Sequence, residues 1–556
     1  MTPLQRYLKL LSLDKKDIYQ IVFYAVFAGL VSLSLPLGIQ AIVNFIQSGR
    51  ISASWIVLVV VVVIGVALVG ILSLMQLRIT ENLQQKIFIR SSFEFAARLP
   101  KIRFSERYSE YPPEVANRFF DTMSIQKGTS KLLIDFSAAL LQIIFGLILL
   151  SLYHPFFIVF GIALFVLLYV IFKFSYHPGL KTSMKESKLK YKVAGWLQEI
   201  ARNSFSFKRV QHADFALAKN DYITADYLQH REQHFNILKR QFIQLIFFKI
   251  LITASLLSIG GYLVISQKMN IGQFVAAEII ILLVISSVEK IVLGLETFYD
   301  VLTSVEKIGE VTDMEIETDV PAPALSCYTG IELAAEKLGF KYPEQQTPIL
   351  ENISFKISQG EKIVLDGPNG SGKTTLMRIL AGLIQPTTGT FFINDDTFRK
   401  IDLHHYRMHV SSIIHGETPF QGTMMENLTF RDSNVEEEEI RKALEAVHLT
   451  DYVKTLTNGL ETMVNPEGRQ LSSSNAQKIL LARSIVTRPL ILFLEDPTDT
   501  MDAEAAREII DYIMSPSNRW TVLVSSKNTY WKNKATRIIT MQNGKIVNDQ
   551  NQSTHA

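Results

Sequence analysis

Hydrophobic residues follow two different patterns along the chain, and the change comes near residue 300. Before it, long apolar runs recur, each close to the ~20 residues that a helix needs to cross a bilayer. There are six such runs: 18–45, 55–77, 132–153, 155–176, 241–265 and 271–295. After residue 330, short aliphatic runs alternate with segments of helical periodicity, a pattern typical of an α/β domain. The sequence therefore predicts a multidomain protein: an all-α six-helix transmembrane domain followed by an α/β domain.

Charge in the connections predicts how the spans are oriented. The short connections between paired spans carry only Arg50 and Lys268 as basic residues. The two long connections, 78–131 and 181–240, are rich in Lys and Arg and keep a helical periodicity, so the spans should continue as helices beyond the membrane. Excess positive charge marks the cytoplasmic side. We therefore expect the long connections, both termini and the α/β domain in the cytoplasm, with the basic segment 1–16 leading into a first span rather than a cleaved signal peptide.

The composition agrees with this division and limits the functions to consider. Of 556 residues, 48% are hydrophobic, and the net charge of +3 gives no indication of a nucleic-acid partner. The single cysteine, Cys327, excludes an internal disulfide and a cysteine-based metal cluster. The acidic segment 311–330 contains two prolines and is typical of a linker. We expect domains at 1–310 and 331–556, joined by this linker.

The strongest chemical signal is a glycine-rich segment, 367–374, that matches the phosphate-binding pattern G-x-x-x-x-G-K-[ST]. It follows the apolar run 362–365, which predicts a strand, and precedes a helical stretch; such a loop needs this strand–loop–helix context. Glycines let backbone N–H groups surround phosphate oxygens, and Lys373 can reach the β- and γ-phosphates. The Thr374 hydroxyl can ligate Mg²⁺. The candidate nucleotide-binding residues in this segment are Gly367, Pro368, Asn369, Gly370, Ser371, Gly372, Lys373, Thr374 and Thr375.

Six spans, two long cytoplasmic extensions and a phosphate-binding loop together resemble one half of an ABC exporter in which the membrane and nucleotide-binding domains are fused. The resemblance covers nearly the whole chain. It is greatest to the type I secretion branch, which exports hemolysins and bacteriocins, without that branch's N-terminal peptidase-like domain. It implies ATP and Mg²⁺ as cofactors, the bacterial inner membrane as location, and a second ABC half as partner in a homodimer or heterodimer. A periplasmic adaptor protein is a further candidate partner.

Two more segments match motifs of this family. Tyr342 stands where the family's A-loop aromatic stacks on adenine. The segment 471–475, Leu-Ser-Ser-Ser-Asn, aligns with the family's signature Leu-Ser-Gly-Gly-Gln, which grips the γ-phosphate bound to the opposite subunit. Ser472 keeps the signature hydroxyl, whereas Ser473 and Ser474 replace both glycines and add Cβ atoms where backbone should approach phosphate. We therefore expect looser closure of the nucleotide site.

The acidic pair after the apolar run 491–494 departs from the family in its order. Glu495 stands where the Asp that orients Mg²⁺ belongs, and Asp496 stands where the Glu that positions the attacking water belongs. Both charges remain, but Glu495 is one methylene longer than the Asp it replaces, and Asp496 is one methylene shorter than the Glu it replaces. Misplacement on the order of 1 Å can cost ~10²-fold in rate. We therefore predict slow hydrolysis beside intact ATP binding.

Two other positions of the site also differ from the family. Lys527 occupies the position of the switch histidine. An ammonium can contact a γ-phosphate as a point charge, but it cannot both donate and accept as neutral imidazole can; an ordinary surface lysine fits the pattern equally well. His415 stands where the Q-loop glutamine senses Mg²⁺ and links the site to the membrane helices, and an unrelated loop histidine is an equal alternative.

The membrane half contains two groups of residues that are candidates for coupling and transport. In exporters of this kind, short helices at the cytoplasmic tips dock on the nucleotide-binding domains, and segments 112–121 and 213–222 are the candidates here. Their expected anchors are Phe120, Phe215 and Tyr222. Charges inside spans are costly, so they either line a polar cargo path or pair between helices. The charges in question are Lys249, Glu278, Glu289 and Lys290.

The leading functional hypothesis is an ATP-driven exporter subunit that binds ATP more effectively than it hydrolyses it. Its cargo would be a peptide, a protein or another hydrophobic molecule. The alternative is a membrane scaffold or regulatory subunit, deficient in hydrolysis, that binds ATP and pairs with another ABC half or a secretion adaptor. A lipid flippase is a third possibility, because nothing in the spans distinguishes lipid from peptide.

Overall fold

The computed structural model describes residues 1–47, 53–108, 111–317, 330–343 and 345–552. Contacts divide the chain into two compact units, each with its own core. One comprises Met1–Ile102 and Glu110–Glu315, and the other comprises Arg103–Ser109 and Ile316–Ala556. Most of the expected linker, including Cys327, lies outside the described residues.

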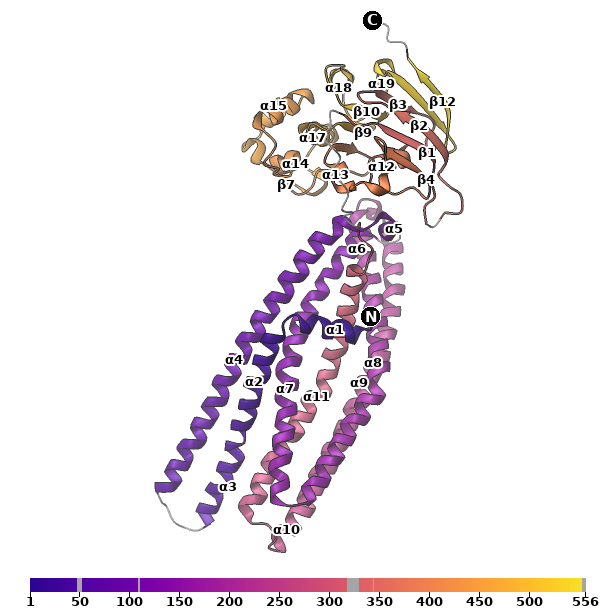
Figure 1. Ribbon diagram of the computed structural model, residues 1–556. Coiled ribbons are helices and arrows are strands. Elements are labelled where there is room, and N and C mark those ends of the chain that lie inside the picture. The colour runs from indigo at the N-terminus through magenta and orange to yellow at the C-terminus, as the bar shows by residue number, and fades with distance from the viewer. Residues whose placement is uncertain (48–52, 109–110, 318–329, 344, 553–556) are drawn as a thin grey trace. The chain divides into compact units, whose positions relative to one another are not determined.

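The first unit is built from long helices that lie side by side (Figure 1). Their bounds are α1 Pro3–Ser12, α2 Lys15–Ser32, α3 Ser34–Gln47, α4 Ala53–Arg98, α6 Pro112–Asn117, α7 Asp121–Tyr153, α8 Phe156–Arg202, α9 Val210–Ser255, α10 Gly261–Ile265 and α11 Ile271–Thr312. Within the described residues, six stretches are long and apolar enough to span a membrane: Lys15–Gln47, Ala53–Lys101, Pro112–Tyr153, Phe156–Arg202, Val210–Ile265 and Ile271–Thr312. This confirms the six expected spans, and most of these helices continue well past their apolar runs, as the polar periodicity predicted.

Glycines in this bundle allow close approach between helices. A Cβ at Gly179 of α8 would lie 2.5 Å from Cζ of the Tyr299 ring on α11. A Cβ at Gly128 of α7 would overlap the Val301 side chain of α11. Small residues at helix contacts are characteristic of membrane bundles, because association there depends on van der Waals packing. These contacts fix α11 against both α7 and α8.

The intramembrane charges have different environments. Lys249 Nζ on α9 lies 2.6 Å from Glu289 Oε2 on α11, so these two form an interhelical pair. Glu278 and Lys290 form no ion pair within the described part of the chain. The pairing alternative therefore accounts for two of the four charges.

The first candidate docking segment packs within its own unit. Residues 112–121 belong to the first unit, where Val115 packs with Phe95 and Val311. The part of the first long connection that groups with the second unit is instead 103–109, which contains the short helix α5, Phe104–Tyr108. A docking role for residues 112–121 stays a prediction.

The second candidate segment, 213–222, lies within α9. Phe215 makes an edge-on contact with the Trp196 ring of α8, at 6.2 Å between ring centroids, so it is partly engaged inside its own unit. Tyr222 and Phe120 are largely exposed. Their docking role stays a prediction.

The second unit contains a six-stranded sheet in the order β12-β11-β3-β10-β9-β6 and a four-stranded antiparallel sheet in the order β2-β1-β4-β5, with a two-stranded ladder of β7 and β8. The strands are β1 Leu333–Phe340, β2 Leu350–Ile357, β3 Lys362–Asp366, β4 Thr388–Ile393, β5 Asp396–Thr397, β6 Val410–Ile413, β7 Gly422–Thr423, β8 Met463–Val464, β9 Ile491–Glu495, β10 Thr521–Ser525, β11 Arg537–Gln542 and β12 Lys545–Asn551. The helices are α12 Lys373–Leu380, α13 Leu403–Arg407, α14 Met424–Thr429, α15 Glu437–Ala446, α16 Thr450–Thr455, α17 Ser473–Val486, α18 Ala503–Met514 and α19 Thr529–Lys534. The predicted α/β class is confirmed.

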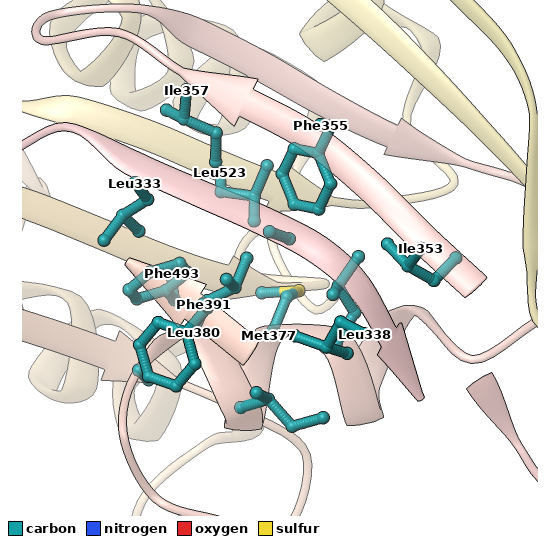
Figure 2. Packing of buried hydrophobic residues seen from close by; sticks show 14 of the residues in the cluster. Leu333, Leu338, Ile353, Phe355, Ile357, Met377, Leu380, Phe391, Phe493 and Leu523 are labelled. Atoms are coloured by element: carbon teal, nitrogen blue, oxygen red, sulfur yellow. The ribbon is translucent and has the colours of Figure 1, made fainter. Parts of the chain in front are cut away.

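The two sheets share an apolar core with α12, and Figure 2 shows part of it. Leu333 and Phe355 from the antiparallel sheet pack in one buried cluster with Met377 of α12 and Phe493 of β9. The parallel strands β3, β9 and β10 are apolar and buried on both faces, as is usual for strands covered by helices. Because these neighbouring strands run parallel, their carboxyl ends meet at one edge of the sheet, and the candidate site lies at that edge.

Candidate nucleotide-binding site

The glycine-rich segment connects the end of β3 to the start of α12, and three of its glycines have positive φ. The φ angles are 136° at Gly367, 82° at Gly370 and 98° at Gly372. A Cβ at Gly372 would lie 2.6 Å from Leu350 Cδ2, and one at Gly367 would overlap the Met541 carbonyl. Both the conformation and the packing therefore require glycine. The loop is held in a tight curve in front of the α12 N-terminus.

Lys373 lies inside this curve. Its Nζ donates to the carbonyl oxygens of Gly367 at 2.8 Å and Pro368 at 2.9 Å, and to Ser371 Oγ at 3.2 Å. Burial lowers the pKa of the Lys373 ammonium, while nearby carboxylates, Asp366 foremost, oppose that shift. The loop thus presents one cation and the N-terminus of a helix to the same space, which suits a phosphate group.

A cavity of about 570 Å³ opens over the loop. It is lined by Tyr342, Ile349, Leu365, Asp366, Gly367, Asn369, Gly370, Ser371, Gly372, Lys373, Thr374, Thr375, Glu495, Asp496, Ser525, Ser526, Lys527 and Lys532. Most of the residues proposed from the sequence therefore come together in one cavity. Pro368 contributes its carbonyl to Lys373 without lining the cavity.

Glu495, the last residue of β9, connects the two sides of the site. One of its carboxylate oxygens accepts from the Thr374 hydroxyl, and Oε2 accepts from the His415 backbone N–H at 2.9 Å. A hydroxyl and a carboxylate directed at the same point are oxygen ligands of the type that Mg²⁺ prefers. The residues present therefore fit a magnesium ion beside the phosphates. His415 contributes to this arrangement through its backbone, and its exposed imidazole does not line the cavity.

Asp496 has a left-handed backbone, with φ of 43°. Its N–H donates to the Ser525 carbonyl at 2.8 Å, which fixes the acid beside the end of β10. Burial raises the pKa of the Asp496 carboxyl, and the negative charge of Asp499 raises it further. Lys527, two residues past the end of β10, lines the same cavity, so a cation and an acid face the space in front of the loop.

Tyr342 also lines the cavity. Its hydroxyl is 3.3 Å from Thr375 Oγ1, and its ring stacks on Tyr108 with centroids 4.9 Å apart and planes 25° apart. Phe340 meets the same ring edge-on at 4.9 Å. An aromatic face placed next to a phosphate loop is suited to stacking on a base.

The serine-rich segment 471–475 lies away from this cavity, at the start of α17. Ser472 caps the helix, because its Oγ accepts from the Asn475 N–H at 3.1 Å. Ser473 and Ser474 form the first turn of the helix, and the Ser473 carbonyl accepts from the Thr500 hydroxyl at 3.4 Å. None of the three serines lines the cavity of its own chain.

The cavity is also lined by an ion pair that was not expected from the sequence. Lys532 Nζ on α19 lies 2.9 Å from Asp366 Oδ2, at the end of β3. Burial alone would raise the pKa of Asp366, but the Lys532 ammonium and the Gly367 N–H lower it below its usual value. The sequence did show one member of this pair, because Asp366 directly precedes Gly367. Its partner could not be found there, because it comes from a helix 166 residues further along the chain.

Comparison with known proteins gives two family matches, the ABC transporter at residues 350–499 and the ABC transporter transmembrane region at residues 18–288. An ATP-dependent lipid A-core flippase of Burkholderia orbicola is 30% identical over 284 residues, 51% of this chain and 48% of that protein. The colicin V secretion/processing ATP-binding protein of Escherichia coli is 27% identical over 283 residues, 49% of this chain and 39% of that protein. The chain thus spans about half the length, or less, of the curated relatives it matches.

Among solved structures, a bacterial Atm1-family ABC exporter with ATP bound superposes with a TM-score of 0.81. The match covers 97% of this chain and 95% of that one, at 19% sequence identity. At this identity the likeness is one of fold. It extends over both units of the chain.

Proposed function

The chain belongs to the ABC transporter family, and on that premise we propose that it is one half of an ATP-driven exporter. The observation that carries the proposal is the meeting of Lys373, Thr374 and Glu495 in one cavity. The cargo is a peptide, a protein or another hydrophobic molecule. One relative is described as a lipid A-core flippase and another as a colicin V secretion protein, so both lipid and peptide cargoes are supported.

ATP would bind with its adenine on the Tyr342 face and its phosphates in the curve of the loop. The backbone N–H groups after Gly367 and the Lys373 ammonium would hold the β- and γ-phosphates. Thr374 and Glu495 would hold Mg²⁺, which supplies charge neutralisation at the transferred phosphate. Lys373 would exchange its hydrogen bonds to the Gly367 and Pro368 carbonyls for phosphate oxygens, so we expect its side chain to move on binding.

Hydrolysis would be slow. Asp496 stands at the position of the general base, beside the residues that would hold Mg²⁺. Its side chain is one methylene shorter than the family's Glu. Its raised pKa also increases the protonated fraction, and a protonated carboxyl cannot accept a proton from water. Lys527 can stabilise phosphate charge but cannot relay a proton as imidazole does. We therefore expect the chain to bind ATP well but to hydrolyse it slowly.

A second ABC half would complete each nucleotide site. Ser472 and the first turn of α17 lie outside the chain's own cavity, and they present N–H groups at a helix N-terminus. Such a surface suits the γ-phosphate of a nucleotide held by another subunit. Ser473 and Ser474 add side chains there, which should weaken closure. The geometry allows a homodimer or a heterodimer, with a periplasmic adaptor as a further partner.

The proposed location is the inner membrane of a bacterium, with the second unit and both termini in the cytoplasm. The Lys- and Arg-rich long connections support this orientation. The competing candidate is a scaffold that binds ATP and regulates another ABC half without turning ATP over. The misordered acids Glu495 and Asp496 are the observation that favours it.

The test is ATP binding and phosphate release by the purified full chain, with Lys373→Ala and the exposed Lys400→Ala as a matched control. We expect Lys373→Ala to weaken ATP binding by about tenfold or more, since a hydrogen bond to a charged group contributes roughly 1.5–3 kcal/mol. Lys400→Ala should behave as the parent chain. Failure of the parent to bind ATP would overturn the proposal. Binding without any Lys373-dependent phosphate release would select the scaffold.

A further inference from the structure

A second cavity lies between α8 and α11 in the first unit, beyond the apolar run of α8. Its volume is about 490 Å³, and one side is basic, with Lys181, Lys185 and Lys188 of α8 among its lining residues. These lysines follow one another at spacings of four and three residues, so they share one helix face. The ATP cavity is separate, because it is formed entirely by the second unit.

The three lysines have no acidic partner in the described part of the chain, although two glutamates of α11 line the same cavity. Glu306 lies 3.1 Å from Arg6 of α1, whose guanidinium also pairs with Asp313. Glu310 is occupied by Lys307 at 2.8 Å. With Lys307 included, four lysines and two glutamates line the cavity, so its lining carries an excess of positive charge and an anion is the complementary ligand.

The same face of α8 is apolar just below the lysines. Val170 and Phe174 precede Lys181 at intervals of eleven and seven residues, which places them on one helix face, and Phe174 is 70% exposed. The apolar run ends at residue 176, and Lys181 follows five residues later, or about 7.5 Å along the helix axis. The headgroup layer is roughly 5–8 Å deep on each side of a bilayer. The face thus changes from apolar to basic at the depth where a lipid changes from acyl chain to headgroup.

We propose that this cavity binds the polyanionic headgroup of a phosphate-bearing lipid, whose acyl chains lie along the apolar face of α8. Lys181 to Lys188 extend over about 10 Å of helix, which is longer than one phosphate group and suits a headgroup with two or more. Basic pockets between membrane helices on the cytoplasmic side are suited to such headgroups. The assignment to the cytoplasmic leaflet rests on the membrane orientation of the proposed function.

The test measures lipid binding to the purified full chain in detergent by native mass spectrometry, with cardiolipin as the diphosphate probe and phosphatidylcholine as the zwitterionic one. The variant is Lys181→Gln/Lys185→Gln/Lys188→Gln. The control removes three exposed lysines that do not line the cavity, Lys127→Gln/Lys192→Gln/Lys239→Gln. Each juxtamembrane lysine typically contributes about fivefold to anionic lipid binding. We therefore expect cardiolipin binding to fall by at least about tenfold in the first triple variant.

The control triple variant should bind cardiolipin within about twofold of the parent chain. A Lys→Arg triple at the same three sites should retain binding, which separates loss of charge from loss of fold. Equal losses in both Gln triples would overturn the proposal, because the effect would then be general surface charge. Inorganic pyrophosphate binding as tightly as cardiolipin would also overturn it, since the ligand would not be a lipid. ATP binding, measured in parallel with Lys373→Ala, tests the proposed function independently of this site.

Discussion

Restoring the family's residue at the second acidic position should reveal how much rate the short side chain costs. The change is Asp496→Glu, which extends the carboxylate by one methylene toward the loop that holds Lys373. A misplacement on the order of 1 Å costs ~10²-fold, which corresponds to about 2.7 kcal/mol of transition-state stabilisation. We therefore expect kcat for ATP hydrolysis to rise by about 10- to 100-fold.

The backbone conformation at position 496 disfavours Glu, but by less free energy than the expected gain in transition-state stabilisation. Asp496 has a φ of 43°, a left-handed conformation that Asp adopts more readily than Glu. The strain should cost about 1 kcal/mol of stability, but it is present in the ground state and the transition state alike. It should lower the melting temperature of the protein without cancelling the gain in kcat.

The assay is steady-state phosphate release by the full chain in lipid nanodiscs, with ATP affinity measured on the same samples. Asp496→Asn serves as the control, since it keeps the length but cannot accept a proton, and it should abolish phosphate release. A rate for Asp496→Glu within about twofold of the parent, with ATP affinity unchanged, would refute the reasoning. The length of the Asp496 side chain would then not limit the rate of ATP hydrolysis.

Three further predictions concern the nucleotide-binding cavity and the serine-rich segment. Because Asp499 helps to raise the pKa of Asp496, the acid limb of the rate profile should lie above the pH at which an ordinary Asp titrates, and Asp499→Asn should shift it to lower pH in a pH–rate measurement. Ser473→Gly/Ser474→Gly should raise the fraction of ATP-closed dimer, measured as distances between spin labels on the two subunits, at a cost of about 0.5 kcal/mol or less per glycine in the first turn of α17; no rise would show that these side chains do not limit closure. Tyr342→Ala should weaken ATP binding by about 5- to 150-fold, since base stacking contributes roughly 1–3 kcal/mol, whereas Tyr342→Phe should stay within about threefold if stacking rather than the hydroxyl is what matters.

The membrane spans and the phosphate loop could be predicted because each depends on local sequence alone. A span needs only a long apolar run, and the loop needs glycines where φ is positive, as at Gly367 and Gly372. The meeting of the loop with Glu495 could also be anticipated, because parallel strands of one sheet, here β3 and β9 on either side of β10, end at the same edge.

Other features depend on contacts that the local sequence does not encode. His415 reaches Glu495 through its backbone N–H, so its side-chain type carries no information about that contact. The pair of Asp366 with Lys532 joins distant segments. The grouping of 103–109 with the second unit depends on tertiary packing, such as the Tyr108 ring on Tyr342, rather than on helix periodicity.

The most direct test of the exporter assignment is whether ATP brings the loop of one subunit to the serine-rich segment of another. The full chain would carry Cys327→Ser, with Asn369→Cys in the loop and Ser473→Cys at the start of α17, both at exposed positions. The account predicts that Mg·ATP increases intersubunit disulfide formation between these two cysteines, and that adding Lys373→Ala removes the increase. Cross-linking that is absent, or that is the same with and without ATP, would contradict the claim that this chain forms half of an ATP-driven exporter.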